Sequence, residues 1–151
     1  FNLYGTVLIC PLSRGNTTIN STDPLSPPLI NPCFFSHPQD LTVMRHAVAG
    51  ARRFPAAPVW DDYILGIFTN ITDLEGSIRN GARTTHHPVG TASMSARDAD
   101  WGVVDADLKL KEAAGVRVVD ASVLPYVPAG HTQAAVYAIA ERAADLIKEQ
   151  R

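Results

Sequence analysis

The fold of this chain is decided by residues 115–147, GVRVVDASVLPYVPAGHTQAAVYAIAERAADLI. Residues 116–119 are predicted to form a short strand, because three of them, Val116, Val118 and Val119, are β-branched. Prolines and Gly130 then predict a stiff loop, and this loop brings His131 to the start of a helix. A histidine is therefore expected where a strand, a loop and a helix follow one another.

The helix that follows His131 is predicted to be amphipathic, because its apolar residues repeat at helical spacing and its charged residues fall largely outside that stripe. The apolar stripe consists of Val136, Ile139, Ala140, Ala143 and Ile147. Thr132 is the expected N-cap, so free backbone N–H groups and the positive end of the helix dipole lie beside His131. The sequence predicts a titratable imidazole next to a site that favours negative charge.

Composition limits the classes of protein to consider. The 151 residues are 46% hydrophobic and carry a formal net charge of -2, which is ordinary for a globular protein with one respectable core. The charge gives no reason to expect a nucleic acid or an anionic membrane as partner. No apolar run approaches the roughly 20 residues needed to cross a bilayer.

A second motif, THHPVGTASM, occupies residues 85–94. Pro88 fixes its own φ angle and favours an extended conformation at His87, and Gly90 permits close approach of backbone. His86 is interpreted as structural, because it points the other way if this stretch is extended. His37 and His46 have no partner at metal-ligand spacing and are interpreted as surface or capping histidines, and no metal site is predicted.

The two motifs together resemble the C-terminal portion of the glucose-methanol-choline (GMC) flavin oxidoreductases, especially fungal aryl-alcohol oxidases. The resemblance implies an α+β fold: an antiparallel-sheet substrate-binding domain with helices, plus a C-terminal strand and helix that complete a Rossmann-like FAD domain. Residues 1–100 would belong to the substrate-binding domain, and residues 101–151 would complete the FAD-binding domain.

The resemblance also implies roles for individual residues. His87 matches the family's catalytic base, and His131 matches the residue that assists it by binding the substrate oxygen. The cofactor-binding residues would be Asp120, Ala121, Gly130, Thr132 and Gln133. For Asp120, a carboxylate that simply caps the turn after the strand is an equally compatible role.

The implied cofactor is FAD, yet no GxGxxG fingerprint of a dinucleotide-binding unit occurs in the sequence. In the family that fingerprint comes from earlier sequence. We therefore expect this chain to work with an N-terminal FAD-binding portion of the same enzyme, and to bind FAD weakly or not at all alone.

The first functional hypothesis is an FAD-dependent alcohol oxidase or dehydrogenase. It would convert a primary alcohol of the aromatic or allylic kind to an aldehyde, with O₂ or a quinone as electron acceptor. The reaction needs a base near the hydroxyl and a hydride acceptor near the carbon, and histidine exchanges protons near neutral pH. The alternatives are a hydroxynitrile lyase on the same scaffold and a catalytically silent binding fragment.

Three Asn-x-Thr sequons, at Asn16, Asn20 and Asn70, favour a secreted, glycosylated protein. Cys10 and Cys33 either form a disulfide or remain two separate buried thiols. Secretion and glycosylation are expectations from these short motifs.

The remaining segments give a coarse secondary-structure prediction. Two short strands in a hairpin or meander are expected at residues 6–10 and 17–20, followed by a proline-rich loop at 23–32 and an amphipathic helix at 38–53. An aromatic and aliphatic cluster lies at 60–68, a short helix is expected at 73–83 and a few extended pieces at 101–110. The cluster is interpreted as core filling, with a substrate wall as the minority hypothesis.

Overall fold

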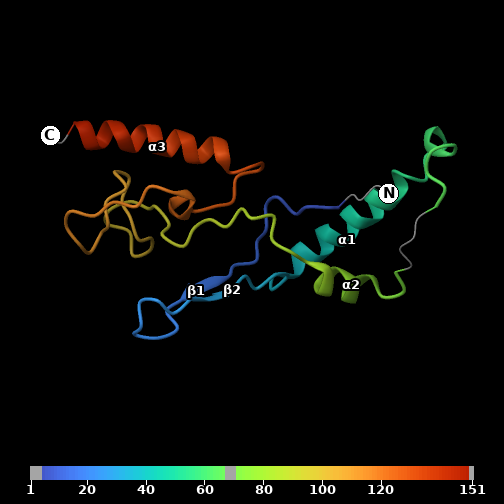
Figure 1. The fold of residues 1–151 in the computed structure, drawn as a ribbon, viewed down its shortest axis with the longest axis horizontal. Coiled ribbons are helices and arrows are strands. Elements are labelled where there is room, and N and C mark those ends of the chain that lie inside the picture. The colour runs from blue at the N-terminus through green and yellow to red at the C-terminus, as the bar shows by residue number, and fades with distance from the viewer. Residues whose placement is uncertain (1–4, 67–70, 150–151) are drawn as a thin grey trace. The chain divides into compact units, whose positions relative to one another are not determined.

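The computed structural model describes residues 5–66 and 71–149, and Figure 1 shows its elements. The chain forms two compact units, Phe1–Arg83 and Thr84–Arg151. The functional division expected at residue 100 remains a prediction. The elements of the described residues are the strands β1 (Asn16–Thr18) and β2 (Leu29–Asn31), the helices α1 (Pro38–Arg53), α2 (Leu74–Gly81) and α3 (Gln133–Lys148), and the 3₁₀ turns η1 (Pro58–Trp60) and η2 (Ala121–Val123).

The first unit contains a two-stranded antiparallel sheet in which Thr17 of β1 lies opposite Ile30 of β2. The prediction of a strand at residues 6–10 is wrong, because no strand forms there. The partner of β1 comes instead from the proline-rich run, where Leu29 and Ile30 supply apolar residues of the kind strands favour. Gly15 makes the pairing possible, since a Cβ at that position would collide with the carbonyl oxygen of Asn31.

Helix α1 confirms the amphipathic helix predicted over residues 38–53. Pro38 is its first residue, and the Nδ1 atom of His37 accepts a hydrogen bond of 3.2 Å from the N–H of Gln39. This N-cap explains His37 without any chemistry. Asp40, in the first turn, is buried, and its carboxylate accepts hydrogen bonds from the N–H groups of Leu12 and Ser13, at 2.9 and 2.7 Å.

These bonds tie the segment before β1 to the start of α1. Burial raises the pKa of Asp40, but the hydrogen bonds from Ser13 and Leu12 and the charge of His37 together outweigh burial and leave the pKa below its ordinary value. Asp40 is thus a structural carboxylate that is ionised in the folded protein above acidic pH.

The predicted short helix is present as α2, which packs against α1. Asp73 caps it by accepting a hydrogen bond of 3.0 Å from the N–H of Gly76. Of the aromatic cluster, Trp60 contacts Phe54 and Tyr63 with ring centroids 5.3 and 6.2 Å away. Tyr63 is largely exposed, which does not support simple core filling at that position, and the residues at 67–68 lie outside the described part.

The core of the second unit consists of Val104, Leu108, Val123 and Ala143, with Met94, Leu110, Val118 and Ile139 packed against it. Helix α3 confirms the predicted helix, and its buried residues are Ala143 and Leu146, whereas Ile147 of the predicted stripe is 44% exposed. The helix is therefore rotated slightly relative to the predicted face, so that Leu146 takes the place expected for Ile147.

The strand predicted at residues 116–119 is wrong in the described chain. A single antiparallel bridge between Lys109 and Arg117 takes its place. Val116 is 49% exposed, and Val118 alone of the three valines packs against the core. The β-branched composition misled the prediction, because strands need several successive paired residues and this segment finds only one.

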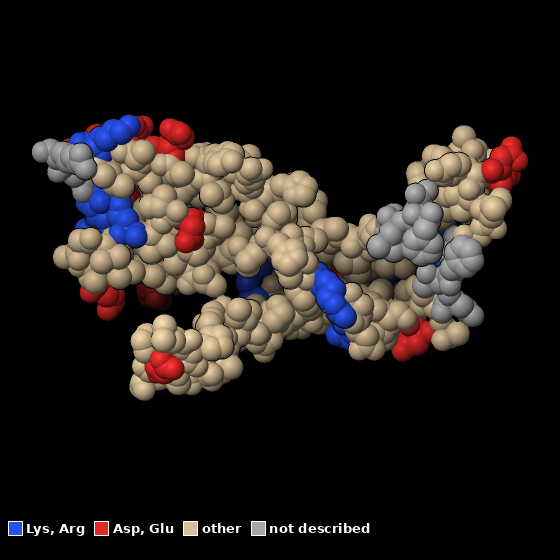
Figure 2. Space-filling model, in the orientation of Figure 1, with Lys and Arg blue, Asp and Glu red and all other residues tan. Residues whose placement is uncertain are grey.

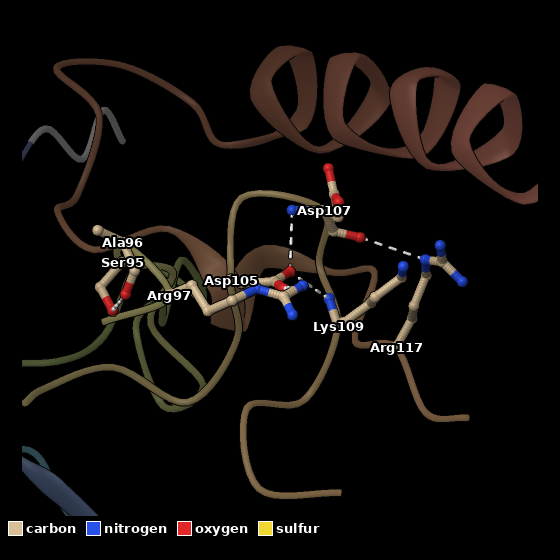
Figure 3. A network of polar contacts seen from close by, with 7 residues as sticks. All are labelled: Ser95, Ala96, Arg97, Asp105, Asp107, Lys109 and Arg117. Carbon is tan, nitrogen blue, oxygen red and sulfur yellow. Dashed lines mark hydrogen bonds and ion pairs between the residues drawn. The ribbon is translucent and has the colours of Figure 1, made fainter. Parts of the chain in front are cut away.

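Figure 3 shows the polar network that holds the irregular part of this unit together. Asp105 is only 4% exposed. One of its carboxylate oxygens accepts hydrogen bonds from the N–H groups of Asp107 and Lys109, at 2.9 and 3.0 Å, and the other pairs with Arg97 at 2.5 Å. A further hydrogen bond of the network runs from Nε of Arg117 to the carbonyl of Asp107 at 3.2 Å. The carboxylate thus supplements the scattered backbone bonds of this segment, such as those from the N–H of Lys111 to the carbonyl of Val103 at 3.0 Å and from the N–H of Val118 to the carbonyl of Leu108 at 3.1 Å.

Charged side chains on the face drawn in Figure 2 form small groups of both signs separated by uncharged surface. This distribution agrees with the net charge of -2. Among the described residues no helix is long and apolar enough to cross a membrane. Cys10 and Cys33, in the first unit, are free thiols rather than a disulfide, but the predicted burial is wrong, because Cys10 is exposed and Cys33 is half-buried.

Candidate functional site

The first half of the site is the segment that carries His87. His86 has a left-handed backbone, with φ of 61°, rather than the extended conformation assumed from the sequence, and its N–H donates to Oγ1 of Thr84 at 3.0 Å. The carbonyl oxygen of His86 lies 3.1 Å from Nδ1 of His87. Gly90, with φ of 88°, lets the chain pass close to the carbonyl of Leu124, as its predicted role requires.

Backbone hydrogen bonds connect this segment to the turn η2. The N–H of Ala92 donates to the carbonyl of Ser122 at 2.9 Å, and the N–H of Met94 donates to the carbonyl of Val123 at 2.8 Å. Val123 is fully buried in the core of the unit. The segment after His87 is therefore fixed to the segment that leads to His131.

The second half of the site is the loop before α3. The N–H of Gly130 donates to the carbonyl of Pro128 at 2.8 Å, which tightens the loop ahead of His131. Thr132 is the N-cap, as predicted, and α3 begins at Gln133. Thr132 is buried, whereas His131 is exposed.

The structure brings the two predicted histidines together. Nε2 of His87 lies 2.8 Å from Nδ1 of His131, and the rings are perpendicular with centroids 5.0 Å apart. Oγ1 of Thr132 lies 3.4 Å from Nδ1 of His87. Two imidazoles in a direct hydrogen bond share one hydrogen between two nitrogens, so the pair is built to accept and move a proton.

Two predicted cofactor-binding residues lie at the turn η2. Asp120 is its N-cap and accepts a hydrogen bond of 2.7 Å from the N–H of Ser122. Hydrogen bonds from the side chain and the backbone N–H of Ser122 hold the pKa of Asp120 below its ordinary value, although burial opposes them. Asp120 therefore caps the turn η2, as the sequence analysis allowed. Because Asp120 is exposed and Ala121 is half-buried, both residues remain accessible to a ligand.

The other predicted cofactor-binding residues lie at the start of α3, and they fit an electron-rich group. The side chain of Thr132 makes no capping bond to the first turn of α3. The backbone N–H groups of that turn, at the positive end of the helix, therefore lack the side-chain acceptor that an N-cap usually supplies. No atom lies within 4 Å of the position of a Cβ on Gly130. The side-chain amide of Gln133 donates a hydrogen bond of 3.0 Å to the hydroxyl of Tyr137.

The sequence did not predict that His86 and Thr132 contact the ring of His87. A threonine next to a histidine at a helix start is a usable signal for the hydroxyl contact. No local pattern predicts a left-handed backbone at His86. Among the residues that the structure describes, no group of three or more potential ligands is arranged to hold a metal ion.

The sequence comparisons identify the family of the chain. The family model described as GMC oxidoreductase matches residues 11–140. The chain belongs to the GMC oxidoreductase family and represents its C-terminal domain. It is 46% identical to the dehydrogenase eriK of Hericium erinaceus, over 93% of this chain and 26% of that protein. It is 40% identical to pyranose dehydrogenase 3 of Leucoagaricus meleagris, over 96% of this chain and 25% of that protein.

Solved structures give the same answer. The formate oxidase of Aspergillus oryzae RIB40 aligns with a TM-score of 0.82 and 32% identity, over 93% of this chain and 26% of that one. A fungal aryl-alcohol oxidase aligns with a TM-score of 0.79 and 34% identity, over 95% of this chain and 24% of that one. The small antiparallel sheet and helices are thus the fold of this family's C-terminal domain.

The chain spans about a quarter of the length of the relatives that it matches. The GMC family and its structural neighbours are FAD-dependent flavoproteins. FAD is accordingly the cofactor of the family to which this chain belongs.

Proposed function

We propose that this chain supplies the proton-transferring histidine pair of an FAD-dependent alcohol oxidase or dehydrogenase. The observation that carries the proposal is the 2.8 Å contact between Nε2 of His87 and Nδ1 of His131. The chain would act together with an N-terminal FAD-binding portion of the same enzyme, whose Rossmann-like domain residues 101–151 would complete. Relatives named as dehydrogenases and oxidases support an oxidoreductase over the lyase alternative.

An alcohol carbon loses hydride readily only as its hydroxyl proton leaves, because the developing alkoxide pushes electron density into the C–H bond. His87 is the base in this proposal: its Nε2 takes the hydroxyl proton. His131 donates a hydrogen bond to the substrate oxygen and stabilises the negative charge that develops there. FAD, when bound, supplies the hydride acceptor.

The residues around the pair have supporting roles. The uncapped first turn of α3, at Thr132 and Gln133, presents N–H groups that stabilise negative charge on a bound ligand. Gly130 leaves room for that ligand. Asp120 and Ala121 are proposed to lie against the ribityl or phosphate part of FAD.

The substrate class proposed is a primary alcohol whose carbon is activated by an aromatic or allylic group. The likeness to a fungal aryl-alcohol oxidase supports it. Pyranose dehydrogenases and a formate oxidase among the relatives show that other substrates occur in the family. The electron acceptor proposed is O₂ or a quinone, and the protein is proposed to be secreted.

The test is His87→Ala in the flavoenzyme that contains this chain. We expect the rate of flavin bleaching by an aromatic primary alcohol without O₂ to fall by about 10²- to 10⁴-fold, the range that general base catalysis supplies. Flavin absorbance of the purified enzyme should stay the same. His46→Ala is the matched control, because His46 is an exposed histidine of α1. An unchanged rate in His87→Ala would remove His87 from the role of base.

A further inference from the structure

A histidine works as a base only when the reacting nitrogen carries no hydrogen, and two contacts of His87 decide which nitrogen that is. The first is the carbonyl oxygen of His86, 3.1 Å from Nδ1. A carbonyl oxygen only accepts hydrogen bonds, so the hydrogen must sit on Nδ1 of His87. In the neutral ring Nε2 is then the bare nitrogen.

The second contact is the hydroxyl of Thr132, 3.4 Å from the same Nδ1. Thr132 is buried, and its hydroxyl is free to accept because it makes no capping bond to α3. Both groups therefore lie on the Nδ1 side of the ring. Nε2, on the opposite side, receives the hydrogen on Nδ1 of His131 at 2.8 Å.

The carbonyl of His86 belongs to the peptide that leads directly into His87, so its contact with Nδ1 is set by the φ angle and side-chain torsions of His87 itself. The backbone of His86 determines instead where this peptide and the ring of His87 lie relative to the preceding chain. Its φ of 61° is uncommon for a residue with a Cβ, and histidine is among the residues that tolerate it best. Oγ1 of Thr84 holds this turn by accepting the N–H of His86.

We propose that His86 and Thr132 are positioning residues that lock His87 in the Nδ1–H tautomer and so keep its Nε2 bare for the substrate proton. His86 acts through its backbone carbonyl and Thr132 through its side-chain hydroxyl. His131 holds Nε2 of His87 by a hydrogen bond until an alcohol hydroxyl replaces it. This inference rests on the proposed function of His87 as base, and it adds how the competent tautomer is selected.

The direct test is ¹⁵N NMR of the imidazole rings in the flavoenzyme that contains this chain, with the His87 signals identified by their loss in His87→Ala. We expect neutral His87 to carry its hydrogen on Nδ1. A neutral His87 with its hydrogen on Nε2 would overturn the inference, even if His87→Ala still abolishes turnover. Full turnover in His87→Ala would overturn the proposed function but leave the tautomer result standing.

Substitutions at His86 separate its backbone role from its side chain. His86→Asn should keep turnover within about threefold, because asparagine also tolerates a left-handed backbone. His86→Val should lower turnover by about 10- to 100-fold, because a β-branched residue strongly disfavours positive φ and the ring of His87 would move away from Thr132 and His131. Loss of the Thr132 contact should also give a mixed tautomer at His87. The wrong tautomer of a catalytic histidine costs up to about 10⁴-fold in another enzyme class, so the expected range is moderate. Equal turnover in the two variants would contradict the role of His86.

Thr132 provides a second test that does not depend on the folding of His86→Val. Thr132→Val keeps the shape of the side chain and removes the hydroxyl, and it should lower turnover several-fold with increased Nε2–H tautomer. Thr132→Ser should restore both readouts. An unchanged tautomer in Thr132→Val would remove Thr132 from the proposal.

Discussion

Replacing Asp105 by alanine should strongly destabilise the irregular part of the second unit. The carboxylate is nearly inaccessible, and one of its oxygens is the acceptor for two backbone N–H groups, those of Asp107 and Lys109. Each bond to a charged group contributes about 1.5 to 3 kcal/mol, and each orphaned buried N–H costs about 1 to 3 kcal/mol. Since Asp107 and Lys109 are only half-buried, we take the lower part of these ranges and expect about 3 kcal/mol for the pair.

Asparagine at the same position is the informative comparison. Asp105→Asn keeps an oxygen opposite the N–H groups of Asp107 and Lys109 and puts an amide NH₂ in place of the oxygen that pairs with Arg97, so the ion pair is lost. The side chain of Arg97 is 72% exposed, so solvent screens this pair and its loss should cost about 1 kcal/mol or less. Arg97→Ala, the matched control on the other partner, should have the same small effect.

The assay is native-state hydrogen exchange of the peptide that covers residues 92–110, because it reports local opening of this unit whatever the stability of the rest of the protein. A loss of 3 kcal/mol corresponds to exchange about 150-fold faster in Asp105→Ala, and 1 kcal/mol corresponds to about fivefold in Asp105→Asn. Exchange in Asp105→Ala within threefold of the unmodified protein would refute the reasoning. Equal acceleration by alanine and asparagine would show that the charge, not the acceptor oxygen, holds the loop.

Three further predictions concern other parts of the chain. Asp40 has a folded pKa below the ordinary 3.8, so its contribution to stability is complete above about pH 4 and is lost as the pH falls through the folded pKa. Protection of the amides of residues 12–14 from hydrogen exchange, taken relative to the intrinsic exchange rate at each pH, should therefore fall between pH 5 and 2, and Asp40→Asn should weaken that dependence. Gly102→Ala should lower the free energy of unfolding by about 1 to 3 kcal/mol in denaturant titration, because φ of Gly102 is 82° and a Cβ would collide with the side chain of Ser95. Gly115→Ala is the control, since Gly115 also has a positive φ but lies in open space, and it should lower the free energy of unfolding less. Asn16 and Asn20 are exposed, so peptide mass spectrometry of protein secreted by a fungal host should find glycans at these sequons, and unmodified peptides at both would contradict the expectation.

Helices were predictable from this sequence because their signals are local. Pro38 and the apolar repeat fixed α1, Asp73 fixed the start of α2, and Thr132 fixed the start of α3. The face of α3 was less certain, since the choice between Leu146 and Ile147 depends on what packs against the helix. Tertiary contacts determine that Leu146 rather than Ile147 is buried.

Strands were predicted poorly because their pairing is not local. Residues 6–10 and 116–119 have strand composition but lack a partner for several successive residues, whereas the proline-rich run supplied β2. Composition describes what a segment tolerates, and pairing depends on which distant backbone lies beside it.

The site was predictable in part, because the family resemblance pointed to His87 and His131. The structure then placed these two rings in contact, although they are far apart in sequence. The backbone of His86 was beyond prediction, since a left-handed histidine is an exception to the preferences that the sequence reveals. The proposed cofactor contacts of Asp120, Ala121, Gly130, Thr132 and Gln133 stay predictions.

The backbone bonds from Ala92 and Met94 to the carbonyls of Ser122 and Val123 have a consequence for how this unit tolerates mutation. Main-chain bonds of this kind do not depend on side-chain identity. Evolution can therefore replace neighbouring side chains without changing the spacing of the histidine pair. An insertion or deletion between either histidine and these bonds would change that spacing at once, so this segment should accept new residue types and reject changes of length.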